Sequence, residues 1–291
     1  MKVAVERVQA KYAFTARRAC GLLLVPVSSF RYKAQRRDDG LNEHLVELAR
    51  QKPRYGYRRL HVLLERDGEH VNHKRVHRIY REEGLALRRK KRKRCVRTLT
   101  PLGNYTEANQ EWALDFVHDR TASGRSLRVL NVIDAYTRES LAMEVDTSFA
   151  GLRLTRVLDQ IIAERGLPQS IRCDNGPELT SRHFLAWNLE RQINLVHTQP
   201  GKPTQNGYIE SFNGKLREEC LRISWFQNLF EARRIIAAWR RDYNETRPHS
   251  SLNYLTPAEF AARHSRGKDV DSVHLENDQT VFHFTSAAAA G

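Results

Sequence analysis

The order of strand-like and helix-like segments between residues 110 and 262 most restricts the fold that this chain can adopt. Three short apolar segments joined by brief turns come first, and helix-like and strand-like segments alternate after them. Brief turns join antiparallel strands, whereas a helix between two strands lets them run parallel. The order therefore predicts an α/β domain with a five-stranded mixed sheet and helices on both faces. The expected strands are 112–117, 126–134, 140–145, 170–173 and 193–198.

Apolar residues spaced three and four apart predict the helices of the same domain. Gly166 is the expected stop of the first of them. The loop 200–205 separates the last strand from a helix that carries Glu210. The other expected helices are 152–165, 181–191 and 229–243, with a short last helix from Thr256.

The first third of the chain carries the positive charge. The formal net charge is +15 over 291 residues, but residues 1–100 alone hold 27 Lys and Arg against 10 Asp and Glu. A polyanion is the simplest partner for charge that is segregated in this way, and nucleic acid is the most common polyanion. The alternative, a generally basic soluble protein, would not require the segregation.

Residues 38–87 predict a small helix-turn-helix-like module of three helices, 41–50, 57–66 and one that starts at the N-cap Asn72. Asp67-Gly68 and Gly84 are the expected stops of the second and third. The third helix has an apolar side and a basic side. An ordinary helical bundle with a solvated basic face is the alternative, but the charge distribution favours DNA contact.

Residues 1–37 predict two short helices, 3–11 and 15–21, with Thr15 as a cap and Gly21 as a stop. The segment 27–33 then resembles the second helix of a helix-turn-helix, although Pro26 stands where the turn would be. A lone amphipathic helix explains this segment equally well.

Candidate DNA contacts come from the module and from a run of seven consecutive basic residues. Such a run repels itself, so it predicts an arm that becomes ordered on phosphates rather than part of a core. Two histidines of the module, His73 and His77, have zinc-like spacing but no further ligands at a suitable spacing, which favours a surface pair. The candidate DNA contacts here are Arg58, Arg59, Lys74, Arg75, Arg78, Arg88, Arg89, Lys90, Lys91, Arg92, Lys93 and Arg94.

The four cysteines are widely scattered, and no CxxC pair occurs. This pattern predicts neither a disulfide framework nor a cysteine-rich zinc site, and it fits a reducing cytoplasm. The apolar runs are too short to span a bilayer, and the first residues lack a signal-peptide pattern. The expectation is a soluble intracellular protein with no membrane partner.

Three acids stand where a two-metal phosphoryl-transfer site needs them. Asp115 lies on the first expected strand, Asp174 ends the fourth, and Glu210 lies one turn inside a helix, with 35 residues between the last two. Two divalent ions can activate the attacking oxygen and neutralise the leaving one, and hard ions such as Mg²⁺ take carboxylate ligands. We expect these acids to be the catalytic and metal-binding residues, with Asp115 bridging the ions. Two other acids, Asp134 and Glu178, are expected to serve turns instead.

The helix that carries Glu210 offers further DNA contacts. Arg217 lies two turns beyond Glu210 on the same face, where DNA phosphate would enter. Asn213 and Gly214 lie between them and are expected to leave room for a close approach of the DNA backbone. The candidate contacts near the scissile bond are Arg217, Lys215, Lys202 and Gln205.

These motifs resemble the DDE transposases and retroviral integrases, and most closely the OrfB protein of two-frame bacterial insertion sequences. The likeness covers about residues 10–262. It is carried by Trp112-Ala-Leu-Asp-Phe-Val, Arg128-Val-Leu-Asn-Val-Ile-Asp-Ala-Tyr-Thr-Arg, Cys173-Asp-Asn-Gly-Pro-Glu, Gln205-Asn-Gly-Tyr-Ile-Glu-Ser-Phe-Asn-Gly-Lys, Arg247-Pro-His-Ser-Ser-Leu and Tyr55-Gly-Tyr-Arg-Arg-Leu.

The resemblance implies an RNase H-like catalytic core, two Mg²⁺ or Mn²⁺ ions, and cleavage and strand transfer at the terminal inverted repeats of an element. It also implies a homo-multimer on paired ends, a bacterial cytoplasm with association to the nucleoid through DNA, and action fused to or with an upstream OrfA product. The expected domains are a helical segment at 1–37, the module at 38–87, a basic arm and linker at 88–109, the integrase catalytic core at 110–262 and a disordered tail at 263–291.

Two other functions compete with a transposase. A DNA-binding regulator of its own element would bind through residues 1–100 and tolerate changes at the three acids. A plain RNase H-type nuclease would cut but never join, and it would have little need for a basic arm and a DNA-binding module.

Overall fold

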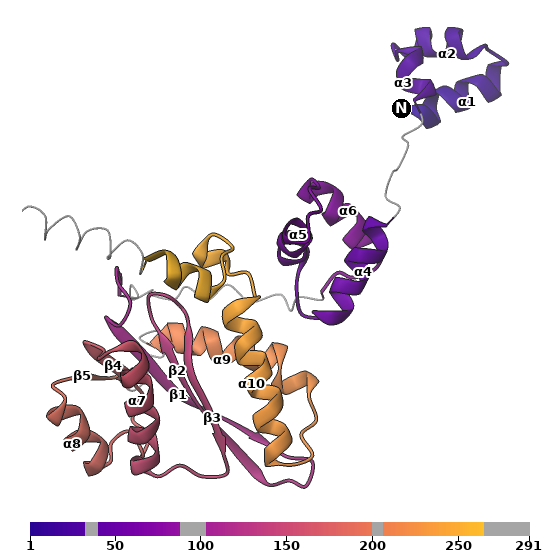
Figure 1. Ribbon diagram of the computed structural model, residues 1–291. Coiled ribbons are helices and arrows are strands. Elements are labelled where there is room, and N and C mark those ends of the chain that lie inside the picture. Colours follow the sequence, from indigo (N-terminus) through magenta and orange to yellow (C-terminus); the bar gives the residue numbers. More distant parts are fainter. Residues whose placement is uncertain (33–39, 88–102, 200–205, 265–291) are drawn as a thin grey trace, which may run out of the picture. The chain divides into compact units, whose positions relative to one another are not determined.

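The computed structural model describes residues 1–32, 40–87, 103–199 and 206–264. The chain forms two compact units, Met1–Val46 and Glu47–Gly291, and each is described by itself (Figure 1). The expected basic arm at 88–94, the loop residues Lys202 and Gln205 and the tail after 264 lie outside the described residues.

Three short helices open the first unit and pack around Val5, Ala19 and Cys20. Thr15 caps the second of them, as predicted, because its hydroxyl accepts a hydrogen bond from the Arg18 backbone N–H at 3.4 Å. The prediction that Gly21 stops this helix is wrong. The helix continues to Leu22, and it is Leu24 that takes the left-handed conformation, with φ of 53°. The helices are α1 (Lys2–Tyr12), α2 (Ala16–Leu22) and α3 (Val27–Arg31).

The expected three helices of the DNA-binding module form as α4 (Leu41–Gln51), α5 (Tyr57–Arg66) and α6 (His73–Glu82). The Asn72 side chain caps α6 by accepting a hydrogen bond from the Lys74 backbone N–H at 2.8 Å. Gly68 and Gly84 follow α5 and α6 with φ of 90° and 67°, a conformation that glycine adopts without steric cost. Both glycines therefore end their helices as the sequence predicts.

The second unit contains the predicted five-stranded mixed sheet, with strand order β3-β2-β1-β4-β5. The first three strands pair antiparallel as a meander, and β4 and β5 add in parallel beside β1. The strands are β1 (Glu111–Arg120), β2 (Ser126–Asp134), β3 (Ser140–Asp146), β4 (Ser170–Cys173) and β5 (Asn194–His197).

Helices cover both faces of this sheet, as expected (Figure 1). On one face, α7 and α8 pack against Trp112, Leu114 and Leu130. On the other, α9 and α10 pack against Ala113 and Val117. Short 3-10 helices Leu221–Ile223 and Ser250–Leu252 follow, and residues 257–264 are helical. The bounds are α7 (Gly151–Arg165), α8 (Arg182–Glu190), α9 (Gly207–Glu219) and α10 (Leu229–Glu245).

The alternation of β1 decides where its acid points. Successive side chains of a strand face opposite sides of a sheet. Since Trp112 and Leu114 face α7 and α8, Asp115 faces the side that α9 and α10 cover. The strand thus directs Asp115 toward the helix that carries Glu210.

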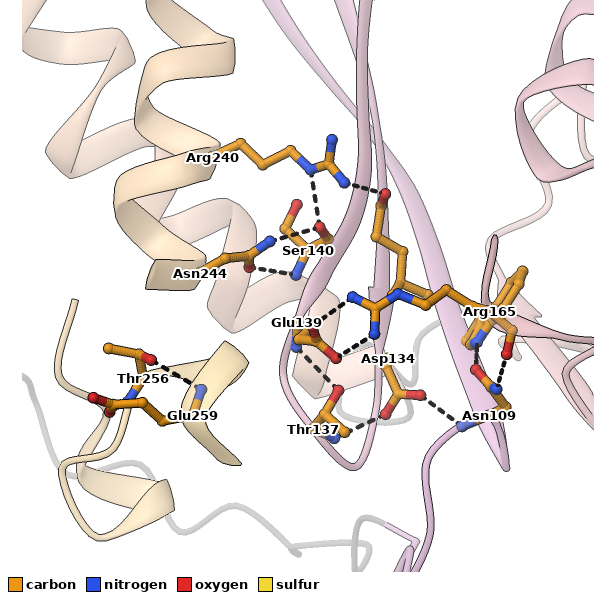
Figure 2. Close-up of polar contacts among 12 residues, drawn as sticks. Asn109, Asp134, Thr137, Glu139, Ser140, Arg165, Arg240, Asn244, Thr256 and Glu259 are labelled. Atoms are coloured by element: carbon orange, nitrogen blue, oxygen red, sulfur yellow. Dashed lines mark hydrogen bonds and ion pairs between the residues drawn. The ribbon is translucent and has the colours of Figure 1, made fainter. Parts of the chain in front are cut away.

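The turn between β2 and β3 is fixed by buried polar groups (Figure 2). Asp134 accepts hydrogen bonds from the backbone N–H groups of Tyr136 and Thr137, both at 2.8 Å, which confirms the prediction that it caps this turn. Its other oxygen accepts from the Asn109 N–H at 2.7 Å. Asn244 of α10 bonds both backbone groups of Ser140 at 2.9 and 3.0 Å. These contacts hold α10 in register with the sheet.

None of the helices that the structure describes is long and apolar enough to cross a membrane.

Candidate active site

Asp115 is the half-buried acid of the site. Its Oδ1 accepts a hydrogen bond from the Phe116 backbone N–H at 2.8 Å, and its Oδ2 accepts from Asn213 Nδ2 at 2.7 Å. The pKa of Asp115 is raised to about 6: burial and the charge of Asp174 raise it, while the two hydrogen bonds and the charge of Arg217 oppose the rise. The two hydrogen bonds therefore fix the orientation of Asp115. Its surroundings disfavour the ionised carboxylate unless a positive charge lies beside it.

Asp174 lies beside Asp115 because of the parallel pairing of β1 with β4. The register pairs Ala113 with Arg172 near the end of β4, and Asp174 directly follows that strand, close enough for its charge to raise the pKa of Asp115. Asp174 Oδ1 accepts a hydrogen bond from the Gly176 N–H at 3.0 Å, and a Cβ atom on Gly176 would lie 3.1 Å from the same oxygen. The Asn-Gly turn that follows β4 thus fits closely around this carboxylate.

Asn213 belongs to the site in a role that the sequence did not predict. Its Oδ1 accepts a hydrogen bond from Asn131 Nδ2 at 2.7 Å, while its own Nδ2 donates to Asp115. Asn131 and Asn213 are 0% and 2% exposed, so water cannot replace these bonds. The expectation that Asn213 leaves room for DNA is wrong, because its side chain fills the space between α9 and the sheet. An asparagine in mid-helix, three residues after Glu210, was the signal available in the sequence.

Glu210 is exposed in the first turn of α9, and Arg217 is exposed two turns further along the same helix. The charge of Arg217 lowers the pKa of Asp115, so this guanidinium lies close enough to act on the site. Within residues 1–32, 40–87, 103–199 and 206–264, no three His, Cys, Asp or Glu side chains are close enough to hold a metal ion. The structure therefore brings Asp115 and Asp174 together and leaves Glu210 outside that pair, on the helix that Asn213 ties to it.

The donor chemistry of the pair nevertheless fits a hard divalent cation. Carboxylate oxygens are the ligands that Mg²⁺ prefers, and a dication would offset both the burial and the repulsion by Asp174 that raise the pKa of Asp115. His73 and His77 do not join any such group in the part of the chain that the structure describes.

Glu178, expected to serve a turn, accepts a hydrogen bond from the Arg128 guanidinium, which lowers the pKa of its carboxyl. Its backbone carbonyl also accepts from Ser181 Oγ at 2.8 Å, and Ser181 caps α8. The acid is thus occupied by an ion pair and by the turn into α8.

Two predicted DNA contacts face the interior of the second unit. Lys215 is half-buried, and burial, followed by the charge of Arg247, lowers its pKa to about 8. Arg59 donates to Glu219 at 3.4 Å. Arg58 and Lys74 are exposed, whereas Arg75 and Arg78 are half-buried. DNA contact by all of these residues stays a prediction.

These observations define a class of protein: a five-stranded mixed sheet with an acid on its central strand, a second acid after the neighbouring parallel strand and a third on α9, the helix that follows the last strand. Residues 105–203 and 191–257 match two models of the integrase core domain. Residues 36–93 match an HTH-like domain.

The chain is 46% identical over 272 residues to the insertion element IS407 uncharacterized 31.7 kDa protein of Burkholderia multivorans, covering 92% of this chain and 98% of that protein. It is 31% identical over 223 residues to the transposase InsD for insertion element IS2D of Escherichia coli, covering 72% and 73%. The chain therefore belongs to the family of insertion-element transposases of the OrfB type, which combine an HTH-like domain with an integrase core domain.

Among solved structures, the chain is similar to the HTLV-2 integrase catalytic core domain in complex with magnesium, with a TM-score of 0.43 and 16% identity over 53% of this chain and 96% of that one. It is also similar to a chain of the simian T-cell lymphotropic virus intasome, with a TM-score of 0.47 and 17% identity over 75% and 74%.

Proposed function

We propose that this chain is a DDE transposase that cleaves DNA at the ends of its insertion element and joins those ends to new DNA. The observation that carries the proposal is the pair of neighbouring aspartates, one of them hydrogen-bonded to the helix that bears Glu210. A half-buried carboxylate with a raised pKa next to a second carboxylate is typical of a functional site rather than of a surface.

The ligands of two Mg²⁺ or Mn²⁺ ions would be Asp115, Asp174 and Glu210. When bound, such ions would activate the attacking oxygen and neutralise the charge on the leaving oxygen of the phosphodiester. Glu210 would complete the set that the two aspartates begin, since it lies three residues before Asn213 on the same side of α9.

The residues of the chain itself orient the reacting groups. Asn213 and the Phe116 N–H fix both oxygens of Asp115 and favour its ionised form. Arg217 places a positive charge near the acids, where it would attract the phosphate to be cleaved. The fixed positions spare the site any reorganisation when the charge of the reacting phosphate develops.

The HTH-like domain and the basic first third would supply DNA binding at the terminal inverted repeats and on the target. Joining two ends requires both of them in one complex, so we propose a homo-multimer on paired ends, with or without an upstream OrfA product.

A plasmid carrying the gene with its native flanking DNA tests the proposal. Wild type, Glu210→Gln and the matched control Glu218→Gln, an exposed acid of the same helix, would be compared with Mg²⁺ and with EDTA. Each would also be tested fused to the upstream reading frame. Nicked ends and joined circles are expected for wild type and Glu218→Gln only, and only with the metal. DNA binding without any cleavage would indicate a regulator, and cleavage without joining would indicate a nuclease.

A further inference from the structure

A cleft of about 540 Å³ lies within the second unit, and Asp115, Asp174 and Glu210 do not line it. One wall comes from Arg54, in the segment that leads into α5, and from Tyr57 and Arg58 in the first turn of that helix. The other comes from the turn after α10 and contributes Ser250 and Tyr254. Both walls belong to motifs that the chemistry of the acids does not use, Tyr55-Gly-Tyr-Arg-Arg-Leu and Arg247-Pro-His-Ser-Ser-Leu.

The lining of this cleft is suited to an anion. Arg54 and Arg58 are exposed at it, and none of the described residues that line it is acidic. Arg58 Nε donates to the Tyr57 hydroxyl at 3.2 Å, and the Tyr254 hydroxyl is a second hydrogen-bonding neighbour of the same guanidinium. Guanidinium groups held next to phenol hydroxyls offer the donors that bind phosphate oxygens.

Buried ion pairs hold the two walls together. Arg247, which is 1% exposed, donates to both carboxylate oxygens of Glu219 at 2.6 and 2.7 Å, and Arg59 donates to the same carboxylate at 3.4 Å. At the far end of α5, Arg66 donates to the carbonyls of Thr246 and Tyr254 at 3.5 and 3.3 Å. The spacing of the walls is therefore fixed by the fold.

The turn that presents Tyr254 is strained. Asn253 and Tyr254 have φ of 53° and 63°, and a bulky aromatic residue rarely adopts this left-handed conformation. Strain of this kind persists where the surroundings impose it, and it concentrates at binding sites. Here the bond from Arg66 to the Tyr254 carbonyl is part of what imposes it.

We propose that this cleft binds the sugar–phosphate backbone of DNA and so joins the DNA-binding module to the integrase core on one duplex. The inference rests on the proposed function for the identity of the DNA. The binding itself requires neither the acids nor a metal ion. Contacts of this kind position a protein on a duplex without reading its sequence.

Binding of the full chain to a fluorescent duplex that carries one element end, in EDTA and over a series of salt concentrations, tests the proposal. The double variant Arg54→Ala/Arg58→Ala is expected to bind at least fivefold more weakly and to reduce the slope of log K against log salt by about two, since each lost phosphate contact removes about 0.9. Arg156→Ala, which removes an exposed arginine of α7, is the matched control and is expected to keep the wild-type slope. Equal slopes for the double variant and the control would overturn the proposal.

Crosslinking locates the contact directly. Ser250→Cys in a Cys95→Ser background is expected to form a disulfide with duplexes that carry a thiol tether on a phosphate, because Ser250 is exposed at the cleft while Cys20, Cys173 and Cys220 are buried. Ser123→Cys, exposed in the hairpin between β1 and β2, is the control. No more adduct at Ser250 than at Ser123 would also contradict the proposal.

The two proposals can fail separately. If Glu210→Gln abolishes joining while the cleft variants bind as wild type does, the transposase function stands and the cleft proposal falls. If neither wild type nor any variant joins DNA, but the cleft variants bind DNA more weakly and with a smaller salt slope, the cleft is a DNA-binding site of a protein that does not catalyse joining.

Discussion

At the scale of single residues, Asn213 connects the helix of Glu210 to the strand of Asp115. Asn213→Ala would leave the buried Nδ2 of Asn131 without an acceptor and Asp115 Oδ2 without a donor. We expect a loss of about 1–3 kcal/mol in the free energy of unfolding and a fall in DNA joining of about 10–100-fold, with DNA binding unchanged. Glu218→Gln, which changes an exposed side chain of the same helix, is the control. Wild-type joining by Asn213→Ala would show that the bond does not position Asp115.

A second residue-scale prediction concerns divalent cations. Mg²⁺ should raise the free energy of unfolding by about 1.4 kcal/mol at ten times its dissociation constant, since it would bind the folded chain alone. Asp115→Asn should remove this increase, because an amide is a poorer ligand than a carboxylate. Thermal unfolding with Mg²⁺ and with EDTA measures the effect without any DNA. An equal Mg²⁺ response in wild type and Asp115→Asn would place the ion elsewhere.

The buried side chain of His249 is expected to make the free energy of unfolding depend on pH. Burial, together with the charges of Arg247, Lys215 and Arg59, lowers its pKa to about 2. Below about pH 6.5 the unfolded chain binds a proton at His249 that the folded chain does not bind. The free energy of unfolding is therefore unaffected by this histidine above pH 6.5 and falls by about 1.4 kcal/mol for each pH unit below it. Urea unfolding between pH 4 and 7 should show a shallower dependence for His249→Gln than for wild type.

The exposed His264 serves as the control for that series, and His264→Gln should keep the wild-type dependence on pH. Parallel curves for wild type and His249→Gln would mean that other groups govern acid unfolding.

At the scale of secondary-structure elements, α9 carries two acids in succession with different surroundings. Glu219 pairs with Arg247, which is 1% exposed, whereas Glu218 pairs with the exposed Arg222. Glu219→Gln should cost about 3–5 kcal/mol of unfolding free energy, because it leaves a buried guanidinium without its counter-charge. Glu218→Gln should cost less than about 1 kcal/mol. Denaturant unfolding of the two variants measures the difference, and similar costs would show that the buried pair is not a structural tie.

At the scale of the whole molecule, the segregated charge predicts DNA binding that depends strongly on salt. A protein that makes six to ten phosphate contacts loses about 10³–10⁵ in affinity between 50 and 200 mM salt. Replacing the seven basic residues at 88–94 by glutamine should reduce the slope of log affinity against log salt. Replacing seven exposed acidic residues of the second unit by glutamine should not reduce it. Affinity measured over that salt range checks the prediction, and an unchanged slope for the first variant would assign binding to other residues.

The sequence by itself determined most of the helices and strands and the mixed, five-stranded character of the sheet, and it marked the three candidate acids. Helix and strand periodicity, caps such as Asn72 and stops such as Gly68 are properties of neighbouring residues, so they can be inferred without a fold. The turn role of Asp134 was predictable for the same reason. The stop assigned to Gly21 failed because the choice between Gly21 and Leu24 depends on packing around Cys20 and Val25.

Only the tertiary structure decided which polar side chains meet. Asn213 and Asp115 are 98 residues apart in sequence, and Arg59 and Glu219 are 160 apart. No periodicity specifies such pairs, because they form where separate elements pack and where burial forces each polar group to find a partner. For that reason the sequence marked the acids and the basic charge of this transposase-family chain. The buried partner of Asp115, the inward turn of Lys215 and the arginine-lined cleft became visible only in the folded molecule.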